Sequence, residues 1–149
     1  MISKILVPTD GSKAARKAAL YAVDLAKQLK ASVFVLSVVD NRSFPGRTIP
    51  ARDTARHIIE PVADYLREAA EDYAEEIKKL CDKSGVRSGV VIAAGHPVEE
   101  IVKEAEKKKV NLIVMGSHGR SALTAMVLGS VTSGVAHKET KIPILIVRR

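Results

Sequence analysis

The sequence has almost no cysteine and few aromatic residues, and each shortage excludes a class of protein. Cys81 is the only cysteine, so an intrachain disulfide and a cysteine-based metal cluster are both excluded. There is no Trp, and aromatic residues make up only 3% of the chain, so we expect a core of Val, Ile, Leu and Ala. No run of 18 apolar residues occurs and the first residues lack a signal-peptide pattern, which predicts no membrane association and a cytoplasmic location.

Several catalytic and metal-binding motifs are also missing. The chain has no Walker A lysine motif and no G-x-S-x-G elbow, which argues against a P-loop NTPase and an α/β-hydrolase. Its four histidines do not have the spacing of metal ligands. His96 precedes Pro97 at an expected helix start, so we assign it to the helix end rather than to catalysis.

What is present suits a single α/β domain over residues 1–149 with one hydrophobic core, because 46% of the residues are hydrophobic. The formal net charge of +7 permits attraction to polyanions. Lys and Arg alternate with Glu and Asp along the expected helices, however, which is typical of solvated surfaces. Sparse aromatic residues and the lack of a known motif argue against nucleic-acid binding.

The hydrophobic pattern alternates between continuous apolar runs and helical periods, which predicts a parallel sheet covered on both faces. We expect strands at residues 2–8, 32–39, 87–94, 110–115 and 142–147, and helices at residues 13–29, 61–84, 98–108 and 130–139. Residues 40–60 contain Pro45, Gly46 and Pro50 without a clear period, so we expect a lid, a partner site or a mobile loop there. Pro61 suits the first turn of the following helix, in which Cys81 is expected to be half-buried.

With right-handed crossovers, these elements predict a doubly wound five-stranded parallel sheet with strand order 3-2-1-4-5 and helices on both faces. The switch point of this strand order lies between the first and fourth strands. Ligands of such sheets bind at the carboxyl ends of the strands beside that switch point.

A glycine-rich segment follows the fourth strand, and it is the strongest chemical signal. Gly116-Ser117-His118-Gly119 is followed by nine residues and then by Gly129-Ser130. Glycines allow close main-chain approach, and free N–H groups in a loop or at a helix start favour phosphate. The alternative is a plain strand-to-helix connection in which Ser130 caps the helix. Thr9-Asp10 and Val38 end neighbouring strands, so three distant segments converge on one edge and favour a ligand site.

The chain resembles the universal stress protein family over its whole length. The segments that carry the resemblance are residues 7–12, 36–40, 95–97, 115–121, 129–131 and 142–147. The ATP-binding subgroup of that family is marked by Gly, two residues, Gly, nine residues, Gly and then Ser or Thr. This sequence matches at Gly116, Gly119, Gly129 and Ser130; it departs mildly at Ala122, where many relatives have glycine.

The resemblance implies ATP or a related adenine nucleotide (ADP or AMP) as the ligand. Separately, Asp10 and the phosphates could hold Mg²⁺ through water, as magnesium prefers. The implied contacts to adenine and ribose come from Thr9, Asp10 and Val38, and those to ribose and phosphates from Gly116, Gly119, Arg120, Gly129, Ser130, Val131 and Thr132. Pro8 and Met115 are further expected nucleotide-binding residues. We expect a homodimer through residues 142–147, because this apolar strand lies at an edge of the expected sheet and its free N–H and C=O groups need a partner. The resemblance points the same way. The alternative is a monomer in which a helix or the 40–60 loop covers the edge.

Three functions fit these expectations. The first is a nucleotide-dependent switch or sensor in the stress response, with a protein partner still to be identified. The second is a slow ATP hydrolase, for which Arg120 and His118 are present but no general base is evident. The third is a nucleotide-free interaction protein in which the glycine loop has only a structural role, as the connection between a strand and a helix.

Overall fold

The computed structural model describes residues 1–41, 53–118 and 128–148, and the side chains of its second helix from Val62 onward. The elements in chain order are β1 (Lys4–Pro8), α1 (Lys13–Leu29), β2 (Ser32–Asp40), α2 (Asp53–Lys83), β3 (Ser88–Gly95), α3 (Pro97–Lys107), β4 (Leu112–Gly116), α4 (Ser130–Ala136) and β5 (Ile144–Val147).

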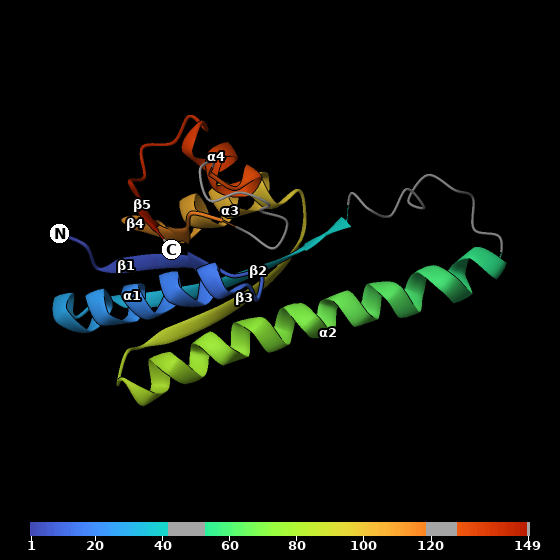
Figure 1. Cartoon of the computed structure of the whole chain (residues 1–149), viewed down its shortest axis with the longest axis horizontal. Helices are drawn as coiled ribbons and strands as arrows, with labels where there is room; N and C mark the ends of the chain where they lie inside the picture. Colours follow the sequence, from blue (N-terminus) through green and yellow to red (C-terminus); the bar gives the residue numbers. More distant parts are fainter. Residues whose placement is uncertain (42–52, 119–127, 149) are drawn as a thin grey trace.

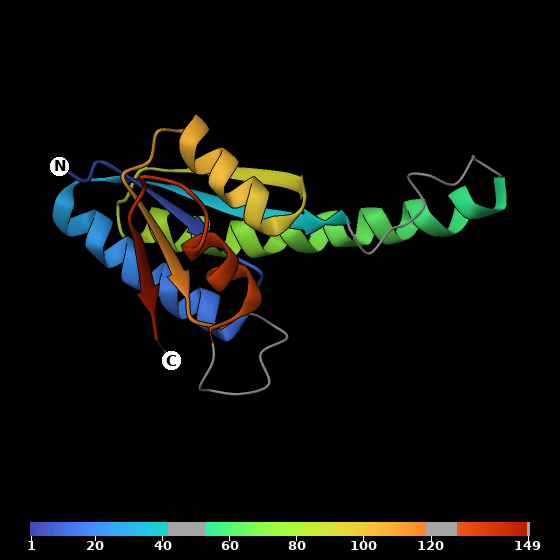
Figure 2. The same ribbon diagram turned by 90° about the horizontal axis from the view of Figure 1, so that it is seen from above.

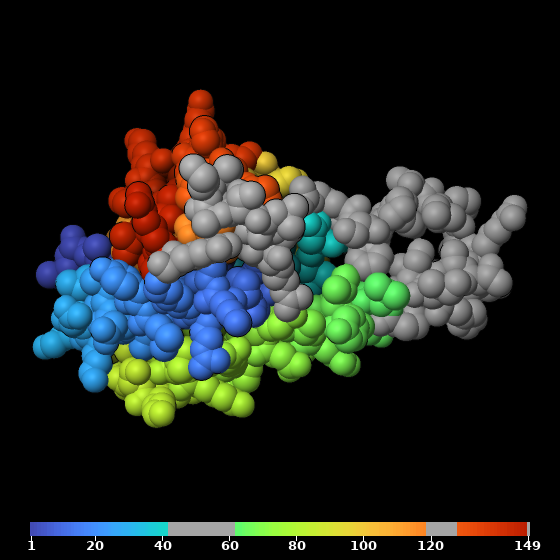
Figure 3. All heavy atoms as spheres, viewed as in Figure 1, coloured from blue at the N-terminus to red at the C-terminus, as the bar shows by residue number. Residues whose placement is uncertain are grey.

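The five strands form one parallel sheet with the order β3-β2-β1-β4-β5. Helices α1 and α2 cover one face and α3 and α4 cover the other (Figure 1). In the space-filling view, α1 and α2 lie side by side along their face (Figure 3). The predicted fold class, strand order and two-sided helical cover are therefore confirmed.

The strands are apolar along their length because both faces of the sheet are buried. In β1, Ile5 and Val7 pack with α1 and α2, whereas Leu6 packs with α3 and α4. β2 alternates in the same way, with Val35 on the first face and Leu36 on the second.

Helix α1 begins with a side-chain cap and packs through small residues. The Ser12 hydroxyl accepts a hydrogen bond from the Ala15 N–H at 3.1 Å, and Lys30 ends the helix in the left-handed conformation. Its buried face is mostly alanine, comprising Ala15, Ala18, Ala19, Ala22, Val23 and Ala26. Small side chains let the helix backbone lie close to β1 and β4.

Two expectations about α2 are wrong. The helix begins at Asp53, so Pro61 lies inside it and not in its first turn, and residues 53–60 are helical and not loop. A proline removes one backbone donor, but the residues on either side contain no other helix breaker, and α2 continues through it. Cys81 is fully buried in the core rather than half-buried, because α2 packs on β2 and β3 at that level.

The first half of α2 projects beyond the sheet, as two perpendicular views show (Figures 1 and 2). The remainder of the expected 40–60 loop, residues 42–52, lies outside the described residues. Within the described residues, no helix is both long and apolar enough to cross a membrane.

One amide side chain links two strands of the sheet at their amino ends. Asn111 Oδ1 accepts hydrogen bonds from the Ser3 N–H at 2.8 Å, the Ser3 hydroxyl at 3.0 Å and the Lys4 N–H at 2.9 Å. This joins the start of β1 to the segment that precedes β4.

Candidate functional site

The candidate site lies at the carboxyl ends of β1 and β4, which are neighbours in the sheet. The chain reverses its direction of winding between these two strands, so the following loops diverge to opposite faces. Pro8 ends β1 and Gly116 ends β4, so Thr9-Asp10 and the glycine segment follow these strands at the same end of the sheet.

The turn after β1 is held by hydrogen bonds from its own side chains. Thr9 is 7% exposed; its N–H donates to the Leu36 carbonyl at 2.8 Å, and its hydroxyl oxygen accepts from the Gly11 N–H at 3.3 Å. Asp10 Oδ1 accepts from the Ser12 N–H at 2.9 Å. The Asp10 carboxylate is thereby fixed at the strand end.

The end of β4 lies against the first turn of α1. A Cβ atom added to Gly116 would lie 2.8 Å from the Ala14 carbonyl oxygen, so only glycine fits without a shift of the backbone. Met115, the preceding residue, is 5% exposed and packs in the core under α3 and α4. Val38 is half-buried in β2 and packs against the same core.

The two ends of the glycine segment are tied together. The Gly129 N–H donates to the Ser117 carbonyl at 2.7 Å, and the Thr132 hydroxyl donates to the Gly116 carbonyl at 2.8 Å. Gly116 and Gly129 therefore lie close together beside β1, although twelve residues separate them. Gly119 and Arg120 lie outside the described residues.

Ser130 does not cap α4, contrary to the alternative considered from the sequence. The N-cap is Gly129, which makes no side-chain cap bond, and Ser130 is the exposed first residue of the helix. Val131 is half-buried against the core, and Thr132 is 4% exposed with its hydroxyl proton donated to Gly116.

His118 is buried rather than directed to solvent. It is 8% exposed, and its Nδ1 lies 2.7 Å from the Ser117 hydroxyl. Its Nε2 is buried and has no hydrogen-bond partner within the part of the chain that the structure describes. The sequence offered no signal for this burial, because a histidine between two glycines is typical of an open loop.

Tyr73 on α2 is a further neighbour of the site that the sequence pattern did not single out. Its ring lies against Gly11 in the turn after β1, at a distance that leaves no room for a side chain there. His96, by contrast, is the N-cap of α3, as expected for a helix-end residue.

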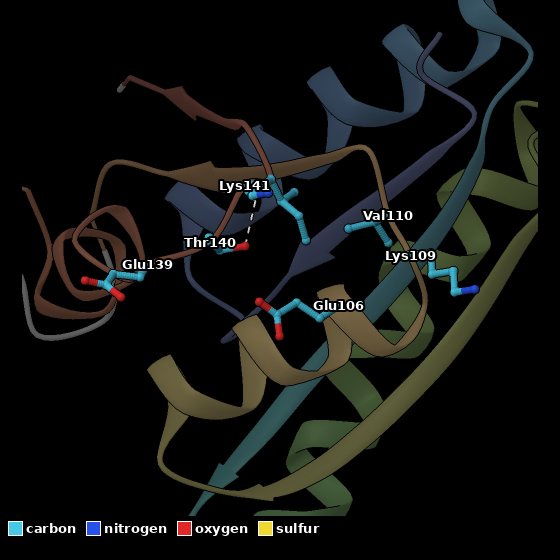
Figure 4. A pocket seen from close by; sticks show the side chains of 7 residues that line it. Glu106, Lys109, Val110, Glu139, Thr140 and Lys141 are labelled. Carbon is cyan, nitrogen blue, oxygen red and sulfur yellow. Dashed lines mark hydrogen bonds between the residues drawn. The ribbon is translucent and has the colours of Figure 1, made fainter.

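A pocket lies at the opposite side of the domain, beside the amino ends of the strands (Figure 4). It is open, has a volume of about 480 Å³ and is lined by Glu106, Lys109, Val110, Glu139, Thr140, Lys141 and Ile142. Its charged side chains have both signs, so it favours neither anions nor cations. Among the described residues, no cluster of three His, Cys, Asp or Glu side chains could hold a metal ion.

The fold and the site define a small doubly wound α/β protein with a glycine-bounded loop at its switch point. The sequence model of the universal stress protein family matches residues 1–148, and the chain belongs to that family. It is 36% identical over 149 residues to universal stress protein MJ0531 of Methanocaldococcus jannaschii, covering 100% of this chain and 84% of that protein. It is 39% identical over 158 residues to universal stress protein MJ0577 of the same organism, covering 100% of this chain and 96% of that protein.

Solved structures agree with this membership. The structure of MJ0577 matches with a TM-score of 0.81 at 35% identity, covering 100% of this chain and 97% of that chain. A universal stress protein solved in complex with cAMP matches with a TM-score of 0.63 at 24% identity, covering 99% of this chain and 97% of that chain. At this identity the second likeness shows the fold alone.

Proposed function

We propose that this chain binds ATP or a related adenine nucleotide at the carboxyl edge of β1 and β4, and that it acts as a nucleotide-dependent switch or sensor in the cytoplasm. The observation that carries the proposal is the hydrogen bond of 2.7 Å between Gly129 and Ser117. It brings Gly129 back to the end of β4, beside the end of β1 that Thr9 and Asp10 follow.

The proposed contacts divide along the ligand. Pro8, Thr9, Asp10, Val38 and Met115 are assigned to the adenine and ribose, and Gly116, Gly119, Arg120, Gly129, Ser130, Val131 and Thr132 to the ribose and phosphates. Mg²⁺ prefers oxygen ligands and keeps several waters, which suits phosphate oxygens together with the Asp10 carboxylate. A universal stress protein of the same fold was solved in complex with cAMP, which supports an adenine nucleotide as the kind of ligand.

The first test is the nucleotide that accompanies the purified protein. Heat release followed by chromatography of the supernatant should yield adenine nucleotide. ATP alone supports a switch, and ADP alone supports the slow hydrolase. Release of no nucleotide, together with no heat of binding in ATP calorimetry, would reject nucleotide binding in favour of an interaction protein.

The second test is substitution within the motif. Gly119→Val and Gly129→Val add branched side chains where the main chain is proposed to approach phosphate, and both should lose ATP affinity in calorimetry. Gly89→Ala, in β3 and away from the site, is the matched control, because its added Cβ would make only ordinary contacts with Phe34. Wild-type affinity in both folded valine variants would contradict the loop assignment.

We expect hydrolysis to be slow, well below the roughly 10 s⁻¹ typical of enzymes. The described residues offer a carboxylate at Asp10, which is already engaged by the Ser12 N–H, and the buried imidazole of His118. Phosphate release should therefore be close to background in the presence of Mg²⁺. Fast release that Asp10→Ala abolishes would contradict this expectation.

We also propose a homodimer through β5. This strand lies at one edge of the sheet, and all four of its residues are only half-buried. An apolar edge strand with free backbone groups is an aggregation risk unless it is paired, and a two-fold axis satisfies it. Light scattering should give twice the chain mass of 16.1 kDa, and Leu145→Pro should disrupt the assembly. A monomeric wild type at micromolar concentration would contradict the dimer.

A further inference from the structure

The turn that carries Thr9 and Asp10 is joined to β2 by the Thr9 N–H, which donates to the Leu36 carbonyl at 2.8 Å. The Thr9 hydroxyl and the Asp10 carboxylate each accept a backbone N–H from within the turn, at 3.3 Å and 2.9 Å. The Thr9 N–H fixes the base of the turn to β2, and these two side-chain bonds order the tip of the turn within itself. Gly11, at its tip, has a φ of 78°, a conformation that glycine adopts at little cost.

The outer side of the turn is supported by one aromatic ring. A Cβ atom at Gly11 would lie 2.4 Å from Cε1, 2.5 Å from Cδ1 and 2.7 Å from Cζ of Tyr73. The bare α-carbon of Gly11 therefore packs directly on the ring. Glycine is required here for two reasons: its φ is positive, and the tyrosine ring leaves no space for a Cβ atom.

The helix that carries the ring packs on the sheet at this level. Tyr73 lies between Ala70 and Ala74, which are 4% and 0% exposed, and Ile77 one turn later is 1% exposed. Beside it, Glu76 pairs with Arg16 of α1 at 2.7 Å. This segment of α2 thus packs on the sheet and contacts α1, which begins immediately after the turn.

We propose that Tyr73 is a positioning residue of the nucleotide site, and that its ring holds the turn of Thr9–Gly11 in the conformation that receives the adenosine part of the ligand. The inference rests on the proposed function. A loop that is already ordered binds its ligand more tightly, because binding does not lose the conformational entropy of ordering the loop. Tyr73 acts through Gly11 and need not touch the nucleotide.

The affinity test compares three variants by ATP calorimetry. Tyr73→Leu removes the ring face and should weaken ATP binding roughly 3- to 10-fold, the effect of leaving a short segment to be ordered on binding. Tyr73→Phe keeps the ring carbons that face Gly11 and should retain more affinity than the leucine variant. Tyr65→Leu is the matched control, because Tyr65 lies on the same helix and is 70% exposed, and it should bind as the wild type does.

A spectroscopic test keeps the native Tyr73 and does not depend on the leucine variant folding. The chain has three tyrosines and no Trp, so Tyr21→Phe with Tyr65→Phe leaves Tyr73 as the only emitter. ATP should change its emission, because the ring lies against the turn that the ligand contacts. The pair Tyr21→Phe with Tyr73→Phe leaves exposed Tyr65 and corrects for absorption of light by ATP.

The outcomes separate this inference from the proposed function. If the wild type binds no ATP, the proposed function fails first. If the wild type binds ATP but folded Tyr73→Leu binds equally well, and the Tyr73 emission changes no more than the Tyr65 control, the positioning role is overturned. Weaker binding in Tyr73→Leu, partial rescue in Tyr73→Phe and a change specific to Tyr73 emission together support it.

Discussion

Gly116→Ala should destabilise the protein by forcing β4 away from the first turn of α1. The new Cβ would lie 2.8 Å from the Ala14 carbonyl oxygen and 2.9 Å from its carbonyl carbon, whereas ordinary contact begins near 3.4 Å. The gap must therefore widen by 3.4 − 2.8, or 0.6 Å. Both sides of the contact are backbone, so no rotamer change relieves it, and the two elements must separate. Gly116 has no positive φ, which leaves sterics as the cause.

Overpacking of this kind costs roughly 1–3 kcal/mol. For a domain of this length, a loss of about 2 kcal/mol lowers the melting temperature by about 4–8 °C. Urea denaturation followed by circular dichroism gives the free energy of unfolding directly. Gly89→Ala is again the matched control, because its Cβ would lie 3.5 Å from the Phe34 ring and should be neutral or slightly stabilising.

Equal midpoints for Gly116→Ala and the wild type, with an unchanged urea slope, would refute the reasoning. That result would mean that α1 can move by half an ångström at no cost. A large loss in Gly89→Ala would refute it differently, since strand glycines would then be sensitive regardless of contact. The comparison isolates the approach of α1 to β4, because both substitutions add the same methyl group.

Three other predictions concern the stability of the scaffold. Ser12→Ala removes the cap bond to the Ala15 N–H and should lower the free energy of unfolding by about 1 kcal/mol in urea denaturation. Ile113→Ala, at a fully buried site, should lower it by about 2–5 kcal/mol, whereas Leu20→Ala, at a site 48% exposed, should change it by less than about 0.5 kcal/mol. Burial raises the pKa of the Cys81 thiol above its ordinary value of 9.0, so the unfolded chain loses that proton first as pH rises. The free energy of unfolding of the wild type should therefore fall more steeply above pH 9.0 than that of Cys81→Ala. Native Cys81 should also resist thiol reagents until urea is added. Parallel pH profiles for the two proteins, or immediate labelling of the native thiol, would count against this account.

The sheet could be predicted from the sequence because its strands are buried on both faces. Ile5-Leu6-Val7 is a continuous apolar run, and its members pack alternately on the two faces. The strand order follows from the right-handed crossover rule once the elements are placed. The same order places Thr9 and Gly116 at one edge without any knowledge of the loops.

The features that the sequence did not predict depend on tertiary contacts or on proline. The position of Pro61 predicts a helix start there, whereas α2 begins at Asp53 and passes through it. The burial of His118 and the bond from Gly129 to Ser117 depend on the path of a loop, which no periodicity encodes. The packing of Tyr73 on Gly11 joins residues 62 positions apart, and its only sequence trace is a glycine that also suits a simple turn.

The fastening of β1 by Asn111 has a mechanical consequence. The chain enters β1 at the amino ends of the parallel strands and leaves β5 at their carboxyl ends, and β4 lies between these two strands. A force that pulls Lys4 and Val147 apart therefore acts along the strands and loads their hydrogen bonds in shear, all together rather than one after another. The three bonds to Asn111 Oδ1 lie where that load enters. In a single-molecule pulling experiment, this sheet should yield abruptly at high force, and Asn111→Ala should lower the peak.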